Sequence, residues 1–346
     1  MPIADIIKLA VSAPSADNSQ SWQFIVDAGA LFCSYRHRAL APDPFGAMGH
    51  ASLISSGALL ENIDAIIASH DSQAEWIFAP PSWQIVVNRV HQLPNISSQA
   101  TERLLSRHTN RHPFSSLAYN DLLELPCSPN CRSITVTAHD KTKALGHAIM
   151  QASTVRFNCK ELHEWLFSSI RWSPEEVESG TGLDINTLHL PPGGRTFMRW
   201  IAPWPRMEIL NRFGVGKLMA VADAALVRES PAVIAIVAGD SPEEAAESGR
   251  LMQRIWLELN ARGIAVHPYY VLTDLFSRRK AKKIDPKWSS YTNNAISTAH
   301  EVLGMSPNER IHMLLRVGKP SCIPVRSKRL PVSAFLDAAT FEQHNA

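Results

Sequence analysis

Residues 107 to 114 read Arg-His-Thr-Asn-Arg-His-Pro-Phe and place two arginines four positions apart. Arg107 and Arg111, with the Thr109 hydroxyl between them, can converge on one phosphate if the backbone turns into a helix. Arginine supplies rigid forked donors, and a helix N-terminus adds oriented N–H groups. An exposed basic turn is the alternative reading of such a run taken alone. The run predicts a phosphate site if other segments supply the rest of a cofactor pocket.

A second segment, residues 13 to 24, combines a loop with the start of a strand. Pro14 and Ser15 end the apolar periodic run 3–11, and turn-forming residues follow. Asn18 and Gln20 carry amides that can hydrogen-bond a heteroaromatic ring on both its donor and its acceptor edges. From residue 22 the sequence alternates as a β-strand does. A plain helix-to-strand turn is the alternative.

Together these segments resemble the nitroreductase superfamily of FMN oxidoreductases, with its Arg-x-Ser-x-Arg/Lys phosphate motif and its Ala-Pro-Ser-x-x-Asn-x-Gln-Pro-Trp loop. The second motif spans residues 13–22 here, with Ser21 in place of the usual proline. Residues 313–320 resemble the family's final strand, and residues 326–331 resemble its basic tail. The resemblance implies the following FMN contacts: Arg107, Thr109, Arg111, Lys328 and Arg329 at the phosphate, and Pro14, Ser15, Asn18 and Gln20 at the flavin.

The motif order indicates an internal duplication. In a one-domain nitroreductase the phosphate motif comes first, whereas here the loop precedes it by about ninety residues. Segments beginning at Gly57 and Gly249 share apolar positions at 60/252, 63/255 and 67/259, as one helical face would. Length and motif order resemble the Acg-type fused nitroreductase-like proteins.

We therefore expect an α+β nitroreductase-like fold with antiparallel-rich sheets flanked by helices. Residues 1–100 would form one half and residues 101–335 the other, as an intrachain pseudo-dimer. Only the second half keeps the Arg-x-Thr-x-Arg motif, so one FMN per chain is expected. A monomer would suffice, and further dimerisation stays open.

The run His267-Pro268-Tyr269-Tyr270-Val271 is expected to form a loop at the flavin edge. The resemblance implies that the backbone of Pro268, Tyr269 and Tyr270 contacts the flavin, with the N–H near Tyr270 meeting flavin N5. Many nitroreductases have a small or acidic residue where Tyr270 stands. Its phenol would therefore shape a different substrate pocket.

Residues 171 to 217 are rich in tryptophan and proline and predict a long irregular excursion rather than a helix. Trp172, Trp200 and Trp204 would line the substrate site as part of a lid or wall over the flavin. Tryptophans that only anchor a surface loop are the alternative.

Composition limits the function classes. A chain of 346 residues exceeds the usual size of a single core, so two fused units are expected. With 45% hydrophobic residues, no spanning run and no signal pattern, we expect a cytoplasmic protein with no membrane partner. The net charge of +2 gives no general field for nucleic acid. Five cysteines without zinc spacing, and His108 and His112 before Pro113, do not favour a metal.

The expected function is an FMN-dependent oxidoreductase that exchanges a hydride with a small planar conjugated molecule. FMN performs this chemistry, so no catalytic side chain is required beyond groups that bind and orient. NAD(P)H would serve as reductant, or oxygen or a quinone as oxidant. One alternative is an oxidase or dehydrogenase of a natural-product pathway that oxidises a heterocycle, or a heteroaryl alcohol such as a bipyrrole methanol to its aldehyde. Another is a protein that binds or sequesters FMN without turnover.

Overall fold

The first part of the chain forms a four-stranded sheet, with one long helix between its second and third strands in sequence. A computed structural model describes residues 2–38, 46–68, 72–93 and 96–336. Its first elements are α1 (Ile3–Ala10), β1 (Trp22–Asp27), β2 (Ala30–Tyr35), α2 (His50–Ile67), β3 (Ala74–Ala79), β4 (Ser82–Val87) and α3 (Ser98–Ser106). The strands are antiparallel in the order β1-β2-β4-β3. Alternate residues of β4, Trp83, Ile85 and Val87, are buried, which is the pattern of a sheet with one covered face.

The second sheet follows the same plan. It contains β6 (Arg132–Val136), β9 (Ala232–Ala238), β10 (Ala265–Tyr269) and β11 (Arg310–Pro320), with α10 (Pro242–Ala261) between β9 and β10. The order is β10-β11-β9-β6, all antiparallel, and the short β5 (Phe114–Ser115) pairs with the end of β11. Listed from its other edge, the second sheet has the order β6-β9-β11-β10, in which each strand corresponds in turn to one of β1-β2-β4-β3. In both sheets the long helix follows the second strand.

The two sheets differ in what is inserted between their strands. In the second half, residues 137–231 stand where the first half has the β1–β2 turn, and we call them the insertion. A segment with α11 (Val271–Lys280) and α12 (Ser289–Leu303) stands where the first half has the β3–β4 turn. All seven residues of β9 are buried, because its alternate side chains enter two hydrophobic cores on opposite faces. One core joins β9 to the first sheet, α2 and α10.

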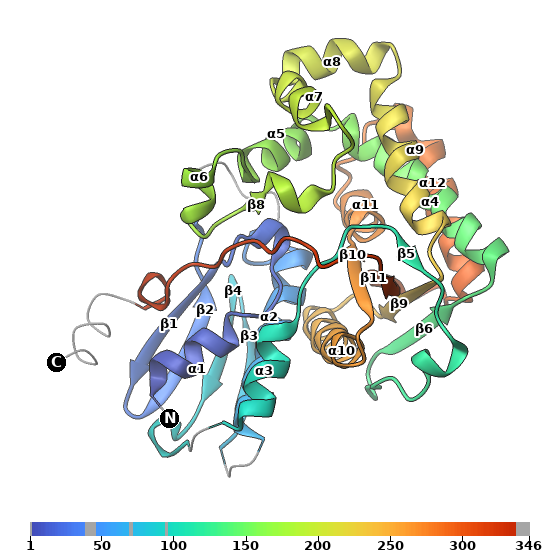
Figure 1. Cartoon of the computed structure of the whole chain (residues 1–346). Helices are drawn as coiled ribbons and strands as arrows, with labels where there is room; N and C mark the ends of the chain where they lie inside the picture. Colours follow the sequence, from blue (N-terminus) through green and yellow to red (C-terminus); the bar gives the residue numbers. More distant parts are fainter. Residues whose placement is uncertain (1, 39–45, 69–71, 94–95, 337–346) are drawn as a thin grey trace.

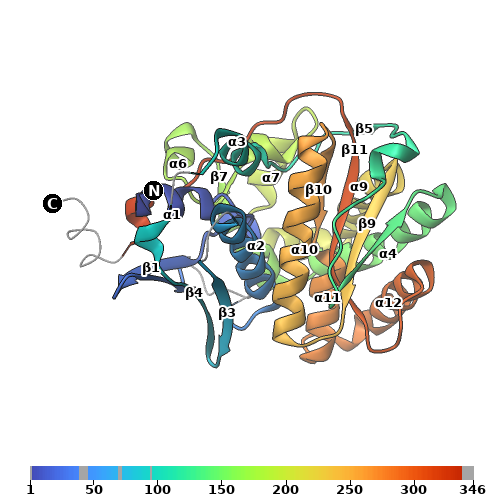
Figure 2. The same cartoon turned by 90° about the horizontal axis from the view of Figure 1, so that it is seen from below.

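Helices α2 and α10 lie side by side between the sheets (Figure 2). Gly57 and Gly249 lie inside these helices, not at their starts as the sequence pattern suggested. A Cβ on Gly57 would come 1.8 Å from the Ala246 carbonyl oxygen, and one on Gly249 would come 2.1 Å from that of Ile54. Each glycine thus meets the residue three positions before its counterpart. Both are required because the backbones touch.

Polar contacts across the same helix pair repeat this reciprocity. Arg254 donates to Glu61 with an N–O distance of 2.7 Å, and the Gln253 side chain donates to that of Asn62, also at 2.7 Å. The shift in residue number that relates Gly57 to Gly249 also relates positions 61 and 62 to positions 253 and 254. It therefore turns the pair Glu61–Arg254 into the pair Gln253–Asn62. Reciprocal contacts of this kind are typical of two-fold interfaces.

The C-terminal segment returns from the second sheet to the first, where Figure 1 shows it ending beside β1. The Phe24 N–H donates to the Phe335 carbonyl at 2.7 Å, and Leu336 forms a parallel bridge with Phe24. The Phe335 side chain is fully buried. Residues near 335, expected to belong to the second half, therefore pack in the first.

The segment 171–217 is largely helical, so the expected irregular excursion is wrong. With its flanks it forms α4 (His139–Phe157), α5 (Lys160–Ser169), β7 (Ile170–Arg171), α6 (Pro174–Glu178), β8 (Leu183–Asp184), α7 (Gly194–Ile201), α8 (Trp204–Arg212) and α9 (Val215–Arg228). Pro174 and Pro205 lie in the first turns of α6 and α8, where no intrahelical N–H bond is lost. Within the described ranges, no helix is long and apolar enough to span a membrane.

Candidate functional site

The loop after α1 is held in a tight conformation. Asp17, Asn18 and Gln20 all have positive φ, at 47°, 58° and 50°. Such angles are uncommon for residues with side chains and persist where surrounding contacts enforce them. The Gln20 N–H donates to the Ser15 hydroxyl at 3.0 Å and closes the loop. Pro14 precedes it in the segment that leaves α1.

Asn18 and Gln20 are buried and connect three parts of the chain. The Asn18 amide donates to the Gly182 carbonyl at 3.0 Å and to the Lys328 carbonyl at 2.9 Å. The Gln20 amide donates to the Gly180 carbonyl at 2.8 Å, and its oxygen accepts from the Leu330 N–H at 3.1 Å. The loop therefore binds both the basic tail and the insertion.

A cluster of arginines lies beside this loop. Arg107 and Arg329 both donate to the Ser12 carbonyl, at 3.0 and 3.4 Å, and Arg107 also lies 4.7 Å from the ring centroid of Trp256. Burial, followed by repulsion from Arg329 and Arg326, holds the pKa of Arg107 well below its ordinary value. Burial lowers the pKa of Arg329 to about 10.

Within the part of the chain that the structure describes, this cluster has no anionic partner. Arg107, Arg326 and Arg329 form no ion pair there, and the buried Nη1 of Arg329 has no hydrogen-bond partner. Buried cations ordinarily have a counter-charge. The arrangement therefore fits a bound anion.

The Arg107 run does not open a helix, contrary to the sequence expectation. It follows α3 and leads to β5, so the run itself supplies no helix N-terminus to the cluster. The Asn110 N–H donates to the Val266 carbonyl at 2.9 Å, and the Asn110 side chain accepts from the His112 N–H at 3.0 Å. These bonds hold the run extended beside β10.

Arg111 reaches the loop from the other side. Its guanidinium donates to the Thr187 carbonyl at 3.4 Å, and burial lowers its pKa while Asp17 and Tyr269 oppose the shift. Thr109 is half-buried. Arg107 thus contacts the Ser12 carbonyl and Arg111 the Thr187 carbonyl, so the two guanidinium groups have different partners.

Two residues that sequence reasoning missed lie near Arg111. Arg316, within the buried strand β11, stacks on the Phe114 ring at 3.8 Å, and its Nε has no partner among the described residues. His267 is buried with its Nδ1 likewise unpartnered, and burial, Arg111 and Arg316 hold its pKa far below the ordinary value. The sequence signal that could have indicated Arg316 is its position among the otherwise apolar residues 313–317.

The run 267–271 is not a loop. His267, Pro268 and Tyr269 belong to β10, and Tyr270 is the N-cap residue of α11. Proline is accepted because β10 is an edge strand. The Tyr269 hydroxyl donates to the Asp223 carbonyl at 3.2 Å.

Tyr270 starts a chain of hydrogen bonds between the halves. The Nε2 of His312 lies 2.8 Å from the Gly239 carbonyl, which can only accept, so Nε2 donates. Burial lowers the pKa of His312 and favours the neutral ring, in which Nδ1 then carries no proton. His50 Nε2, 2.9 Å away, must therefore donate to it, which leaves His50 Nδ1 to accept from the Tyr270 hydroxyl at 3.3 Å. Both imidazoles are neutral in this arrangement.

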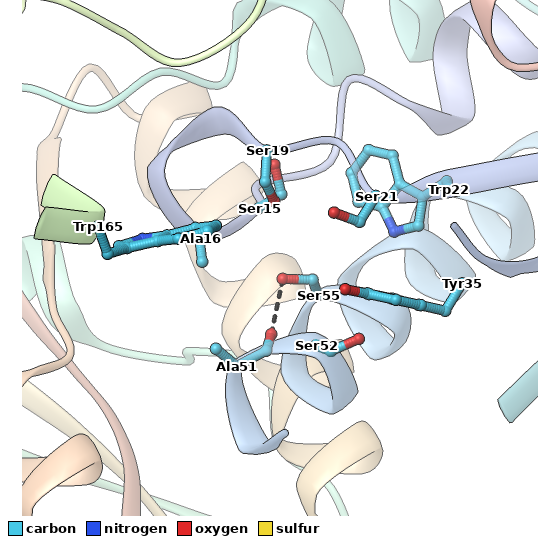
Figure 3. Close-up of a pocket in the computed structure, with 10 residues that line it drawn as sticks. All are labelled: Ser15, Ala16, Ser19, Ser21, Trp22, Tyr35, Ala51, Ser52, Ser55 and Trp165. Carbon is cyan, nitrogen blue, oxygen red and sulfur yellow. Dashed lines mark hydrogen bonds between the residues drawn. The ribbon is translucent and has the colours of Figure 1, made fainter. Parts of the chain in front are cut away.

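A small cavity lies against the Pro14–Gln20 loop (Figure 3). Its lining residues are Ser15, Ala16, Ser19, Ser21, Trp22, Tyr35, Ala51, Ser52, Ser55 and Trp165. The Trp165 indole, from α5, lies beside Ala16 and donates to the Asp17 carboxylate at 2.8 Å. Sequence patterns had not singled out Trp165.

The three predicted tryptophans belong to the helical insertion. Trp172 and Trp204 pack against its small core of Ile170, Ile185, Met198, Ile201 and Met207, and Trp200 is exposed. None lines the cavity of Figure 3. Their role in a substrate site stays a prediction.

Histidine, cysteine and acidic side chains do not gather into a metal site in the part of the chain that the structure describes. The Nδ1 of His108 lies 2.8 Å from the Ser106 carbonyl and 3.0 Å from Arg326 Nη2. His112 lies against the His189 ring, with centroids 4.0 Å apart.

No protein-family model matches the chain. The probable NAD(P)H nitroreductase PigM of Serratia sp. (strain ATCC 39006) is 24% identical over 307 residues, which cover 81% of this chain and 82% of PigM. The chain is thus similar over most of its length to a protein named as a probable nitroreductase. Protein MT1398 of Mycobacterium tuberculosis (strain CDC 1551 / Oshkosh) is 23% identical over 290 residues. These cover 77% of this chain but only 38% of MT1398.

Solved structures of nitroreductases align with lower similarity. The FMN-dependent nitroreductase NfnB from Mycobacterium smegmatis, in complex with NADPH, gives a TM-score of 0.39 at 15% identity over 68% of this chain and 95% of its own. A nitroreductase-like family protein from Bacillus cereus gives 0.37 at 14% identity, over 70% and 97%.

Proposed function

We propose that the chain is an FMN-dependent oxidoreductase that exchanges a hydride with a small planar conjugated molecule. The supporting observation is that buried Arg107 and half-buried Arg329 meet at the Ser12 carbonyl. Among the described residues neither has a carboxylate partner, and the buried Nη1 of Arg329 has no hydrogen-bond partner. The FMN phosphate would supply the missing charge and acceptors.

The phosphate end would be held by Arg107, Thr109, Arg111, Lys328 and Arg329. Lys328 forms an ion pair with Glu178 of α6, and Arg111 donates to the insertion at Thr187. Both contacts would have to be exchanged for contacts to FMN. Arg316 and His267 are additional candidates, because each has a buried nitrogen without a partner.

The ring end would lie between the Pro14–Gln20 loop and the end of β10. Asn18 and Gln20 use their amides on backbone carbonyls, so we propose that they set the shape of the loop at the flavin along with Pro14 and Ser15. The backbone of Pro268, Tyr269 and Tyr270 would face the ring, with the N–H near Tyr270 at N5.

The pseudo-dimer is part of this proposal, with halves 1–100 and 101–335. The matched strand orders and the reciprocal glycine contacts of α2 and α10 support it. One FMN per chain is expected because only one half carries the arginine motif.

FMN supplies the hydride chemistry when bound, and the protein orients the substrate. The name of PigM favours NAD(P)H as the reductant. Oxidation of a heterocycle or heteroaryl alcohol in a natural-product pathway is the same chemistry in the other direction.

Binding of FMN without turnover is a second candidate. The insertion contacts the loop and the motif through Gly180, Gly182 and Thr187, all by backbone carbonyls. A segment fixed in this way could cover the flavin and exclude substrate.

Anaerobic titration of the purified flavoprotein with NADH and NADPH tests these alternatives. Mass spectrometry of the released cofactor should first find FMN, at one per chain. Bleaching by either nucleotide supports a reductase, and bleaching only by an organic donor supports a dehydrogenase. Flavin that resists all of these donors but is bleached by dithionite supports sequestration. A protein that binds no FMN contradicts the proposal.

A further inference from the structure

The α7–α9 segment exposes an unusual number of large apolar side chains. Phe213 is 82% exposed and Leu218 is 70% exposed, on either side of the turn at Gly214. Ile209, one turn before Phe213 in α8, and Val221, one turn after Leu218 in α9, are also exposed. On α7 the exposed pair is Phe197 and Trp200.

These side chains are not needed to hold the helices together. The inner faces of α7 and α8 bury Met198, Ile201 and Met207 in a separate small core. Figure 1 shows α7 and α8 at one end of the molecule, away from both sheets. Six exposed large apolar residues within 25 positions exceed what scattered surface residues explain.

Basic residues accompany this apolar surface. Residues 193–221 contain Arg195, Arg199, Arg206, Arg212 and Lys217 and a single acid, Glu208, for a net charge of +4. All five basic side chains are exposed, and none forms an ion pair with a described residue. The whole chain carries only +2, so the rest carries −2. Positive charge is therefore concentrated on this segment.

We propose that the α7–α9 segment docks on an anionic lipid membrane surface. Aromatic and aliphatic side chains flanked by arginine and lysine are the combination that enters the interface of anionic bilayers. A second copy joined face to face would bring two surfaces of +4 together, which charge repulsion opposes. The expectation of no membrane partner rested on the lack of a spanning run and of a signal pattern, and surface docking needs neither.

The test is co-sedimentation of the full-length holoprotein with phosphatidylglycerol vesicles and with phosphatidylcholine vesicles. We expect binding to the anionic vesicles, weakened by added salt, and little binding to the neutral ones. The variant Phe213→Asp/Leu218→Asp should lower the partition coefficient at least about tenfold. Arg212→Glu/Lys217→Glu should lower it by about fivefold or more for each charge.

Matched controls come from other exposed sites. Ile323→Asp changes a residue that is 94% exposed in the tail, and Lys141→Glu/Lys143→Glu changes exposed lysines of α4. Neither should weaken anionic vesicle binding by more than about twofold. Absence of anionic vesicle binding at low salt overturns the proposal, as does equal loss in the controls. A wild-type oligomer that Phe213→Asp/Leu218→Asp converts to monomer, without vesicle binding, would assign the surface to self-association and also overturn it.

Discussion

Arg107 is the residue on which the proposed phosphate site depends most. It is buried, shares the Ser12 carbonyl with Arg329 and has no carboxylate partner among the described residues. Arg107→Ala removes a charge-assisted contact of about 1.5–3 kcal/mol, so FMN should bind about ten- to a hundredfold more weakly. Flavin fluorescence titration measures this.

Arg103→Ala is the matched control, because Arg103 lies on the preceding helix and pairs with Glu258 at the surface. It should leave FMN affinity unchanged. If both variants bound FMN as tightly as the wild type, residues 107–111 would have a structural role only.

Asn18 is expected to matter for stability as well as for flavin binding. Its amide donates to the carbonyls of Gly182 and Lys328, so Asn18→Ala leaves buried acceptors unpaired at a cost of about 1–3 kcal/mol. Urea denaturation should show the loss, with Asn130→Ala at an exposed loop position as the control. FMN affinity should fall less than for Arg107→Ala.

The Tyr270–His50–His312 chain predicts a dependence of stability on pH. Burial lowers the pKa of His312 to about 4, and burial, Arg310 and His312 hold that of His50 well below its usual value. The unfolded chain then binds more protons, so both histidines stabilise the fold above about pH 6.5.

This stability is lost as the pH falls from about 6.5 towards 4, and His312 alone accounts for up to about 3 kcal/mol. Besides Arg310, the charged groups that act on His312 are Asp240 and Glu244, which oppose the shift. The free energy of unfolding, measured between pH 7 and 5, should fall less steeply in His312→Gln. The exposed His139→Gln should behave as wild type, and an unchanged slope in His312→Gln would contradict the assignment.

At the scale of elements, the contact of α2 with α10 carries the sharpest prediction. Gly57→Ala and Gly249→Ala each place a methyl group against a backbone carbonyl that cannot move aside. Overpacking of this kind costs about 1–3 kcal/mol or more. Thermal unfolding should show similar losses for the two variants if their environments are equivalent. A variant as stable as wild type would disprove the close contact.

Sequence reasoning succeeded where local periodicity and pairing agree. The alternation from Trp22 predicted β1, and residues 313–320, which resemble the family's final strand, lie in β11. It failed in two places. In the insertion, Pro174 and Pro205 lie in the first turns of α6 and α8 and therefore do not interrupt a helix. Residues 267–269 form a strand because β11, distant in sequence, supplies their partners.

The candidate site was predictable only in part. Arg107 and Arg329 do meet, and the loop at Asn18 does contact the tail. Trp165, Gly180 and Gly182 reach the loop from about 150 residues away in sequence, and no short pattern encodes such contacts.

At the scale of the whole molecule, Phe335 should contribute strongly to stability although it lies far from the first sheet in sequence. It is fully buried in the core of the first sheet, so Phe335→Ala should cost about 3–5 kcal/mol. Ile323→Ala, in the same tail but 94% exposed, should cost almost nothing. Denaturant unfolding distinguishes the two, and equal stability of both variants would contradict the packing of the tail.

The path of the tail also sets an order of events during synthesis. The ribosome synthesises Phe24 long before it synthesises Phe335, whose carbonyl pairs with the Phe24 N–H. Until then the nascent first half exposes the apolar surface that Phe335 later covers. Such an incomplete intermediate exposes surface of the kind that chaperones bind, and the first half would become native only after residue 335 has left the ribosome.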